Sequence, residues 1–125
     1  MSKTIIVIDD SETIRDQVKL VLDEAGYQVI EAEDGTEGAA AIRANPDAIL
    51  AICDVNMPRM GGLDMLEHLK TLSLPRTPPV VMLTTEGRPD LIDRARSAGA
   101  KGWIVKPFKP NMLLATVKKI ASVAA

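Results

Sequence analysis

Five short runs rich in apolar residues divide the chain into alternating segments. They span residues 4–8, 28–32, 48–53, 80–83 and 102–105, and polar or turn-forming residues bound each of them. A short apolar run with such boundaries is typical of a strand that is buried within a parallel sheet. The pattern therefore predicts five strands.

The segments between these runs carry helical spacing and helix-end signals. Ser11 and Asp34 are expected to cap the first and second helices, and Glu37 completes a capping-box pattern with Asp34. Pro89 and Pro110 suit the first turns of the fourth and fifth helices. The expected buried positions of the first helix are Ile14, Val18, Val21, Leu22 and Ala25, before a stop at Gly26. Five alternations of strand and helix predict an α/β fold, (βα)₅, with helices on both faces of the sheet.

Composition narrows the class of protein. The 125 residues suit one domain spanning 1–125, with 46% hydrophobic and 26% charged residues. Fifteen Lys and Arg against 17 Asp and Glu give a net charge of −2, which argues against a nucleic-acid footprint or a basic membrane surface. No apolar run approaches the ~20 residues that span a bilayer, no signal peptide is visible, and the single cysteine permits no internal disulfide. We therefore expect a cytoplasmic, single-domain protein without an appended output domain.

Charged residues close three of the apolar runs. Asp9 and Asp10 follow the first run, Asp54 follows the third, and Lys106 follows the fifth. The carboxyl ends of parallel strands meet at one edge of the sheet, where open α/β sheets bind ligands. A single Asp after a strand most often caps the next helix. Three carboxylates and a lysine at several strand ends instead predict one shared site.

This set of side chains is suited to Mg²⁺ and phosphoryl chemistry. Clustered carboxylates raise one another's pKa values, and a divalent cation removes that penalty. Mg²⁺ prefers one or two carboxylates together with water and phosphate oxygens, so one carboxylate can remain free to attack phosphorus. Lys106 could neutralise the transferred group, and the Thr84 hydroxyl could donate a hydrogen bond to it.

Four segments in register carry a family resemblance. The first strand is followed by Asp-Asp-Ser at 9–11, the third by Asp-x-Asn-Met-Pro-x-Met-Gly-Gly at 54–62, and the fourth by Thr-Thr-Glu-Gly at 84–87. Gly-x-x-x-Lys-Pro-Phe occupies 102–108. Together they resemble the receiver domain of two-component response regulators, and especially stand-alone chemotaxis regulators of the CheY type, over essentially the whole chain. The resemblance implies a flavodoxin-like three-layer sandwich with a five-stranded parallel sheet of order 2-1-3-4-5.

The resemblance also implies roles for the residues at the strand ends. Asp54 would be the phosphoacceptor. Asp10, Asp54 and the main-chain carbonyl of Asn56 would bind Mg²⁺, and Asp9 would hold a coordinated water. Lys106 and Thr84 would contact the phosphoryl group.

Further roles follow from the same resemblance. Asn56 and Glu86 would flank the phosphoryl group and tune its hydrolysis, and the bond between Lys106 and Pro107 would be cis. Trp103 lies three residues before Lys106, where the family has a switch aromatic that is usually Tyr or Phe. With Thr84, it would form the conformational switch.

The implied function is a phosphoacceptor switch. A CheA-like histidine kinase would donate the phosphoryl group to Asp54 in a Mg²⁺-dependent reaction. The surface of the fourth helix, fifth strand and fifth helix would then control a partner such as a flagellar motor switch component. The protein would catalyse only its own phosphotransfer and dephosphorylation, and we expect a monomer that binds neither nucleic acid nor membrane.

Other interpretations stay open at this stage. The same switch could be a phosphorelay intermediate, a phosphate sink or a regulator of twitching motility. An aspartyl-intermediate phosphatase is a rival from a different class, but such enzymes use a strand-end Asp-x-Asp, whereas Asp9 and Asp10 are adjacent. A flavin carrier would need a phosphate-binding loop after the first strand, where these carboxylates repel phosphate.

Cys53 is expected to be a buried, inert thiol and His68 a solvated helix residue.

Overall fold

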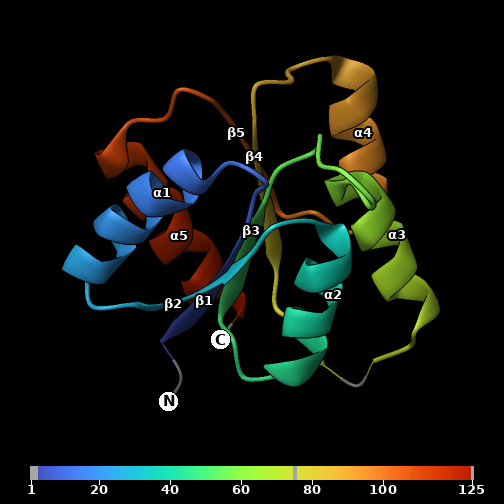
Figure 1. The fold of residues 1–125 in the computed structure, drawn as a ribbon, viewed down its shortest axis with the longest axis horizontal. Helices are drawn as coiled ribbons and strands as arrows, with labels where there is room; N and C mark the ends of the chain where they lie inside the picture. The colour runs from blue at the N-terminus through green and yellow to red at the C-terminus, as the bar shows by residue number, and fades with distance from the viewer. Residues whose placement is uncertain (1–2, 75, 125) are drawn as a thin grey trace.

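Strands and helices alternate along the chain as the sequence predicts (Figure 1). A computed structural model describes residues 3–74 and 76–124. The strands are β1 (Thr4–Ile8), β2 (Gln28–Ala32), β3 (Leu50–Cys53), β4 (Val80–Thr84) and β5 (Gly102–Val105). The helices are α1 (Glu12–Glu24), α2 (Gly35–Ala44), α3 (Gly62–Thr71), α4 (Pro89–Ser97) and α5 (Pro110–Ala124).

All the strands belong to one parallel sheet. Its order is β2-β1-β3-β4-β5, so β1 and β3 lie side by side near the centre. Every neighbouring pair is parallel, and all the strands end at the same edge, at the top of Figure 1. The predicted flavodoxin-like fold of order 2-1-3-4-5 is confirmed.

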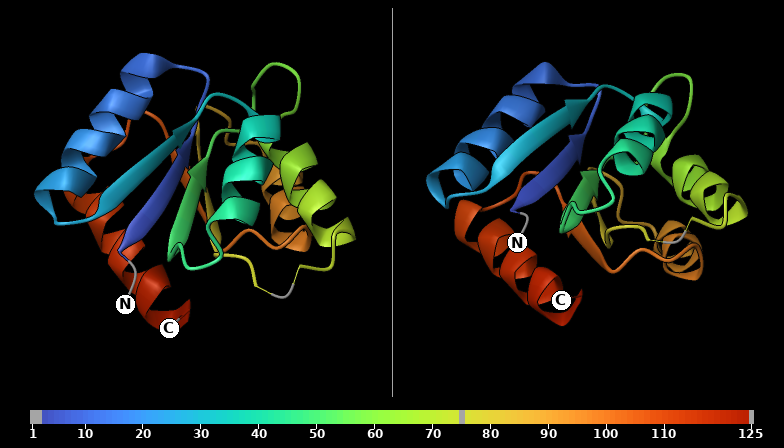
Figure 2. Two further views of the ribbon diagram at one scale, coloured as in Figure 1. Left: turned by 60° about the horizontal axis from the view of Figure 1, so that its bottom comes forward. Right: turned by 90° about the horizontal axis from the view of Figure 1, so that it is seen from below.

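Helices cover both faces of this sheet and enclose two hydrophobic clusters. Helices α1 and α5 lie on one face, and α2, α3 and α4 lie on the other (Figure 2). Side chains alternate between the faces along each strand. In β1, Ile5 and Val7 pack in the cluster with α1 and α5, whereas Ile6 and Ile8 pack in the other. Burial on both faces explains why the strands read as continuous apolar runs.

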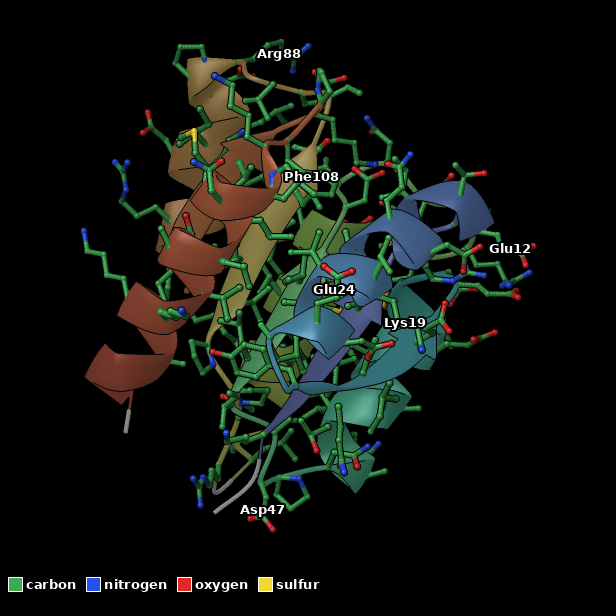
Figure 3. All side chains as sticks on the ribbon, turned by 90° about the vertical axis from the view of Figure 1, so that its left-hand side faces the viewer. Glu12, Lys19, Glu24, Asp47, Arg88 and Phe108 are labelled. Atoms are coloured by element: carbon green, nitrogen blue, oxygen red, sulfur yellow. The ribbon has the colours of Figure 1, made fainter. Side chains whose placement is uncertain are left out.

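Helix α1 follows its predicted start but differs in its buried face. The Ser11 side chain accepts a hydrogen bond from the backbone N–H of Ile14, at 3.3 Å. Figure 3 looks onto this helix, with Glu12 and Glu24 at its two ends. Val18 and Leu22 are buried as predicted, and Ile14 and Val21 pack, partly buried, against the same hydrophobic cluster. Arg15 is also buried, which the pattern did not predict. Ala25 is exposed, and Gly26 follows it with a φ of 92°, as expected for a glycine that ends a helix.

One detail of the second helix differs from the predictions, and the fourth helix packs loosely. The Asp34 carboxylate caps α2 by accepting from the backbone N–H of Glu37 at 2.8 Å. The Glu37 carboxylate, however, accepts from the N–H of Glu33 and does not close the box on Asp34 itself. In α4 only Ala95 is fully buried, so this short helix is lightly anchored to the sheet. Among the described helices, none combines the length and apolar character needed to cross a membrane.

Candidate functional site

The sheet register brings the predicted acidic residues together. Ile8 pairs with Cys53, and the backbone N–H of Asp54 donates to the carbonyl of Ile8 at 3.0 Å. Asp9 and Asp54, which directly follow β1 and β3, therefore lie beside each other. One carboxylate oxygen from each of Asp9, Asp10 and Asp54 lies within 4.8 Å of the others. Asp9 and Asp54 are only 2% and 8% exposed, whereas Asp10 is exposed.

Lys106 reaches this cluster from the edge of the sheet. Its backbone N–H donates to the carbonyl of Thr84 at 2.8 Å, so the residue leaves β5 beside the end of β4. Strand β5 lies two positions from β3, about 10 Å across the sheet, a span that a long side chain can bridge. The Nζ atom donates to Asp9 at 2.8 Å and to Asp54 at 3.1 Å.

Burial and charge set the protonation states in this cluster. Burial raises the pKa of the Asp9 carboxyl above its usual value, although hydrogen bonds from Lys106 and the Ser11 backbone oppose the shift. Burial acts to lower the pKa of Lys106, but the carboxylates of Asp9 and Asp54 outweigh it, so this pKa is raised. Lys106 is therefore held as a cation against the two acids.

Backbone hydrogen bonds leave one oxygen of each buried carboxylate facing the shared site. The Oδ1 atom of Asp54 accepts from the N–H of Val55 at 2.7 Å, and Oδ1 of Asp9 accepts from the N–H of Ser11 at 2.9 Å. Their Oδ2 atoms face Lys106. Oxygen ligands of this kind suit a hard divalent cation such as Mg²⁺. A carboxylate held in place beside a lysine can also act as a nucleophile. The lysine ammonium can then neutralise the negative charge of the anionic group that the carboxylate attacks.

The loop after β4 links the remaining predicted residues. Thr84 is fully buried, and its Oγ1 accepts from the backbone N–H of Glu86 at 3.2 Å. The Asn56 amide donates to the Glu86 carboxylate at 3.3 Å. The half-buried Trp103 indole N–H donates to the main-chain carbonyl of Glu86 at 2.8 Å. Glu86 thus connects Asn56, Thr84 and Trp103 directly.

A buried carboxylate holds the loop that follows Asp54. Asp34 is completely buried, and its Oδ2 accepts from Nε of Arg59 at 2.6 Å and also contacts the Nη2 of Arg59. Arg59 adopts a φ of 64°, in the left-handed region. The N–H of Gly35 donates to the carbonyl of Met60 at 2.7 Å. The start of α2 therefore fixes the loop that carries Asn56.

Replacing Asp34 by Asn is expected to destabilise the protein in a pH-dependent way. The hydrogen bond from the Glu37 backbone, with Arg59, lowers the pKa of Asp34 from its usual 3.8. The unfolded chain then binds this proton more tightly, so the contribution of Asp34 is present above pH 3.8 and is lost as the pH falls below it. At neutral pH we expect Asp34→Asn to lower the free energy of unfolding by about 1 kcal/mol.

Urea unfolding of both proteins across the acidic range measures this difference. Asp93→Asn is the matched control, because Asp93 pairs with Arg96 at 3.6 Å but both side chains are exposed; we expect little change. A loss in Asp34→Asn that stayed constant well below pH 3.8 would contradict the argument.

Several residues around the site were not anticipated from the sequence. Arg15, Asp34 and Arg59 hold the loops that carry the acidic cluster, and the sequence pattern indicates only Asp34 among them, as a helix cap. The signal for Arg15 is its place at the start of the 15/18/22 stripe, a helical face that is otherwise apolar.

The expected cis bond between Lys106 and Pro107 is present.

Cys53 and His68 lie where the sequence predicts, a buried thiol and a solvated helix residue. Cys53 is buried, and burial beside Asp54 and Asp9 strongly raises the pKa of its thiol. His68 is exposed on α3, away from that helix's buried leucines.

Comparison with known proteins identifies relatives of matching length and fold. Residues 5–118 match the family model of the response regulator receiver domain. The chain is 41% identical over 110 residues to chemotaxis protein CheY1 of Helicobacter pylori, an alignment that covers 87% of this chain and 89% of that relative. The structure of CheY4 from Vibrio cholerae aligns with a TM-score of 0.87 and 37% identity, covering 96% of this chain and 99% of that one.

A longer relative matches as well. The chain is 37% identical over 121 residues to the phosphate regulon transcriptional regulatory protein PhoB of Escherichia coli. The alignment covers 96% of this chain but 52% of PhoB. The likeness to PhoB is therefore a likeness to about half of that protein.

Proposed function

Because this chain belongs to the family of response regulator receiver domains, we propose that it is a signalling switch in which Asp54 accepts a phosphoryl group from a histidine kinase. Receiver domains act in two-component signalling, and CheY-type members are signalling proteins and not classical enzymes. The relatives that are chemotaxis proteins support a role in chemotaxis. The PhoB match supports the receiver function alone, since it covers only part of that regulator.

The observation that carries the proposal is the contact of Lys106 with two buried carboxylates. Its ammonium group bridges Asp9 and Asp54 at 2.8 and 3.1 Å, at an edge of the sheet where Asp10 is also within reach. The cation thus lies where a phosphoryl group on Asp54 would place its negative oxygens. If Asp9 and Asp54 only capped the helices that follow them, the contact of the Lys106 ammonium group with both carboxylates would be unexplained.

The chemical step is a transfer of phosphorus from nitrogen to oxygen. A bond forms between a carboxylate oxygen of Asp54 and phosphorus as the bond from phosphorus to the donor imidazole breaks, and the imidazole leaves with the electron pair. Lys106 and the Thr84 hydroxyl would bind the new phosphoryl oxygens. Asp10, Asp54 and the Asn56 carbonyl would hold Mg²⁺, with Asp9 holding a coordinated water, and the charge of the ion would neutralise phosphoryl oxygens. Asn56 and Glu86 would control access of the hydrolytic water.

The output would pass through the loop that joins β4 to α4. If the Thr84 hydroxyl turns towards the phosphoryl group, it releases the backbone N–H of Glu86. The main-chain carbonyl of Glu86 accepts the hydrogen bond from the Trp103 indole, so a shift of Glu86 would also reach Trp103. The lightly anchored α4 follows this loop. The surface of α4, β5 and α5 would then favour a second population that binds a downstream target. In a cytoplasmic chemotaxis system, the donor would be a CheA-like kinase and the target a flagellar motor switch component.

Acetyl phosphate tests the proposed chemistry without the natural kinase. With Mg²⁺ we expect one base-labile phosphoryl group, located on Asp54 by mass spectrometry of peptides. Without Mg²⁺ the yield should fall sharply. A phosphoryl group found on His68 or on a serine in place of Asp54 would overturn the proposal.

Trp103 is expected to report the switch. Among the residues of the chain it is the only tryptophan, so its fluorescence has one source. Phosphorylation should draw Thr84 towards Asp54, free space behind it, and let the indole move further inward. We expect a blue shift of emission and weaker quenching by iodide when acetyl phosphate and Mg²⁺ are added together.

The control for this measurement is Thr84→Ala, which removes the hydroxyl that would contact the phosphoryl group. The spectral change should be lost or reduced in this variant although Asp54 is still modified. Identical spectra and quenching constants for the free and phosphorylated wild-type protein would rule out Trp103 as a switch residue.

A further inference from the structure

Arg15 places a buried cation directly behind the acidic cluster. It belongs to α1 and is only 9% exposed, although the other buried residues of that helix are apolar. Its Nη1 donates to the main-chain carbonyl of Asp9 at 2.6 Å, and its Nε donates to the Glu31 carboxylate at 3.1 Å. Arg15 therefore joins β2, α1 and the end of β1.

The Asp9 carbonyl lies at the point where strand pairing stops. The N–H of Asp9 still donates to the carbonyl of Ala32 on β2, at 3.0 Å. The carbonyl of Asp9 belongs to the peptide group that leads into Asp10, and this group is planar. Holding that oxygen therefore fixes the direction in which the chain enters Asp10. The guanidinium of Arg15 supplies the bond that holds it.

We infer that Arg15 is a positioning residue for the Mg²⁺ site, acting through the peptide group between Asp9 and Asp10, and that Glu31 orients Arg15. The inference rests on the proposed function, because it concerns the metal site of that function. Arg15 touches neither the metal nor the phosphoryl group in this scheme. It sets the relative positions of two of the carboxylates.

Charge and geometry predict opposite effects of Arg15 on Mg²⁺ binding. As a cation near the acids, Arg15 opposes a second cation, so loss of its charge alone would tighten binding. As a planar fork with donors in fixed directions, it holds the Asp9 carbonyl and the Glu31 carboxylate at once, which a lysine cannot reproduce. Arg15→Lys separates the two effects because it keeps the charge and loses the fork.

The test is the Mg²⁺ dissociation constant, measured by calorimetric titration of the folded protein without any phosphodonor. For Arg15→Lys we expect binding to weaken by about tenfold, the lower end of the range for residues that support metal ligands. Glu31→Gln, which leaves Arg15 in place but weakens its anchor, should weaken binding by a smaller factor. Glu12→Gln is the control, since it removes an exposed carboxylate at the start of α1; its effect should be smaller than that of Glu31→Gln.

The outcomes distinguish this inference from the proposed function. If the wild-type protein does not bind Mg²⁺, the proposed function fails. If the wild type binds Mg²⁺ and a folded Arg15→Lys binds it equally well or more tightly, the positioning role is overturned. If Arg15→Lys does not fold, Glu31→Gln decides: binding weaker than in Glu12→Gln supports the inference, and unchanged binding overturns it.

Discussion

Asp54→Asn is expected to abolish phosphorylation by acetyl phosphate, lowering the rate by more than about 10³-fold, as loss of a nucleophile does in other systems. The amide is a poor nucleophile and a weaker ligand for a divalent cation. Its oxygen can still accept the hydrogen bond that Asp54 receives from the N–H of Val55 at 2.7 Å. Lys106 keeps its bond to Asp9. The variant should therefore fold, so that the lost reaction reflects lost chemistry.

Rates of modification measured by intact-protein mass spectrometry give this comparison. Asp47→Asn is the matched control, because Asp47 precedes β3 at the opposite end of the strand from Asp54 and is exposed to solvent. It should be modified at the wild-type rate. If Asp54→Asn were modified at a rate comparable to that of the wild type, another residue would be the phosphoacceptor.

Gly62→Ala is expected to cause the largest loss of stability among single-methyl additions around the site. A Cβ at Gly62 would lie 2.1 Å from the main-chain oxygen of Asp54 and 2.8 Å from Cε of Met82. A methionine end can move, but a main-chain carbonyl at the end of β3 cannot do so without moving Asp54. We expect the free energy of unfolding to fall by roughly 3 kcal/mol, the upper part of the range for overpacked sites.

This loss outweighs the usual benefit of alanine in a helix. Gly62 is the first residue of α3, and replacing glycine by alanine within a helix ordinarily gains at most about 1 kcal/mol. Gly87→Ala is the control, since its Cβ would meet only Cγ2 of Val105, at the ordinary contact distance of 3.9 Å. Urea unfolding should show Gly87→Ala within about 0.5 kcal/mol of the wild type. Equal stability of the two variants would contradict the packing argument.

The sequence predicted the fold and the central cluster because both depend on short-range patterns. Apolar runs mark the strands, and a parallel sheet necessarily brings the ends of those strands to one edge. This geometry is enough to place Asp9, Asp54 and Lys106 together once the strand order is known. The order itself came from the resemblance of the motifs, since the periodicity of the runs does not reveal which strands are neighbours.

The supporting contacts were beyond reach of the same patterns. Arg15 interrupts an apolar helical stripe, but nothing local indicates that its partner is a main-chain oxygen six residues earlier. The pairing of Asp34 with Arg59 depends on a left-handed backbone conformation at Arg59, which is uncommon for a residue other than glycine and is not predicted by the pattern. The bond from Trp103 to Glu86 joins two elements across the edge of the sheet. Tertiary placement decides all three.

The burial of Cys53 makes this thiol a built-in probe of how often the centre of the sheet opens. This thiol is in β3, has no exposed surface, and is the only one in the chain. A maleimide or disulfide reagent can reach it only when the centre of the sheet separates, so the labelling rate measures the free energy of that opening. Asp54 is the next residue. Any ligand that stabilises the closed site slows the labelling by the factor that mass action predicts, without an introduced probe.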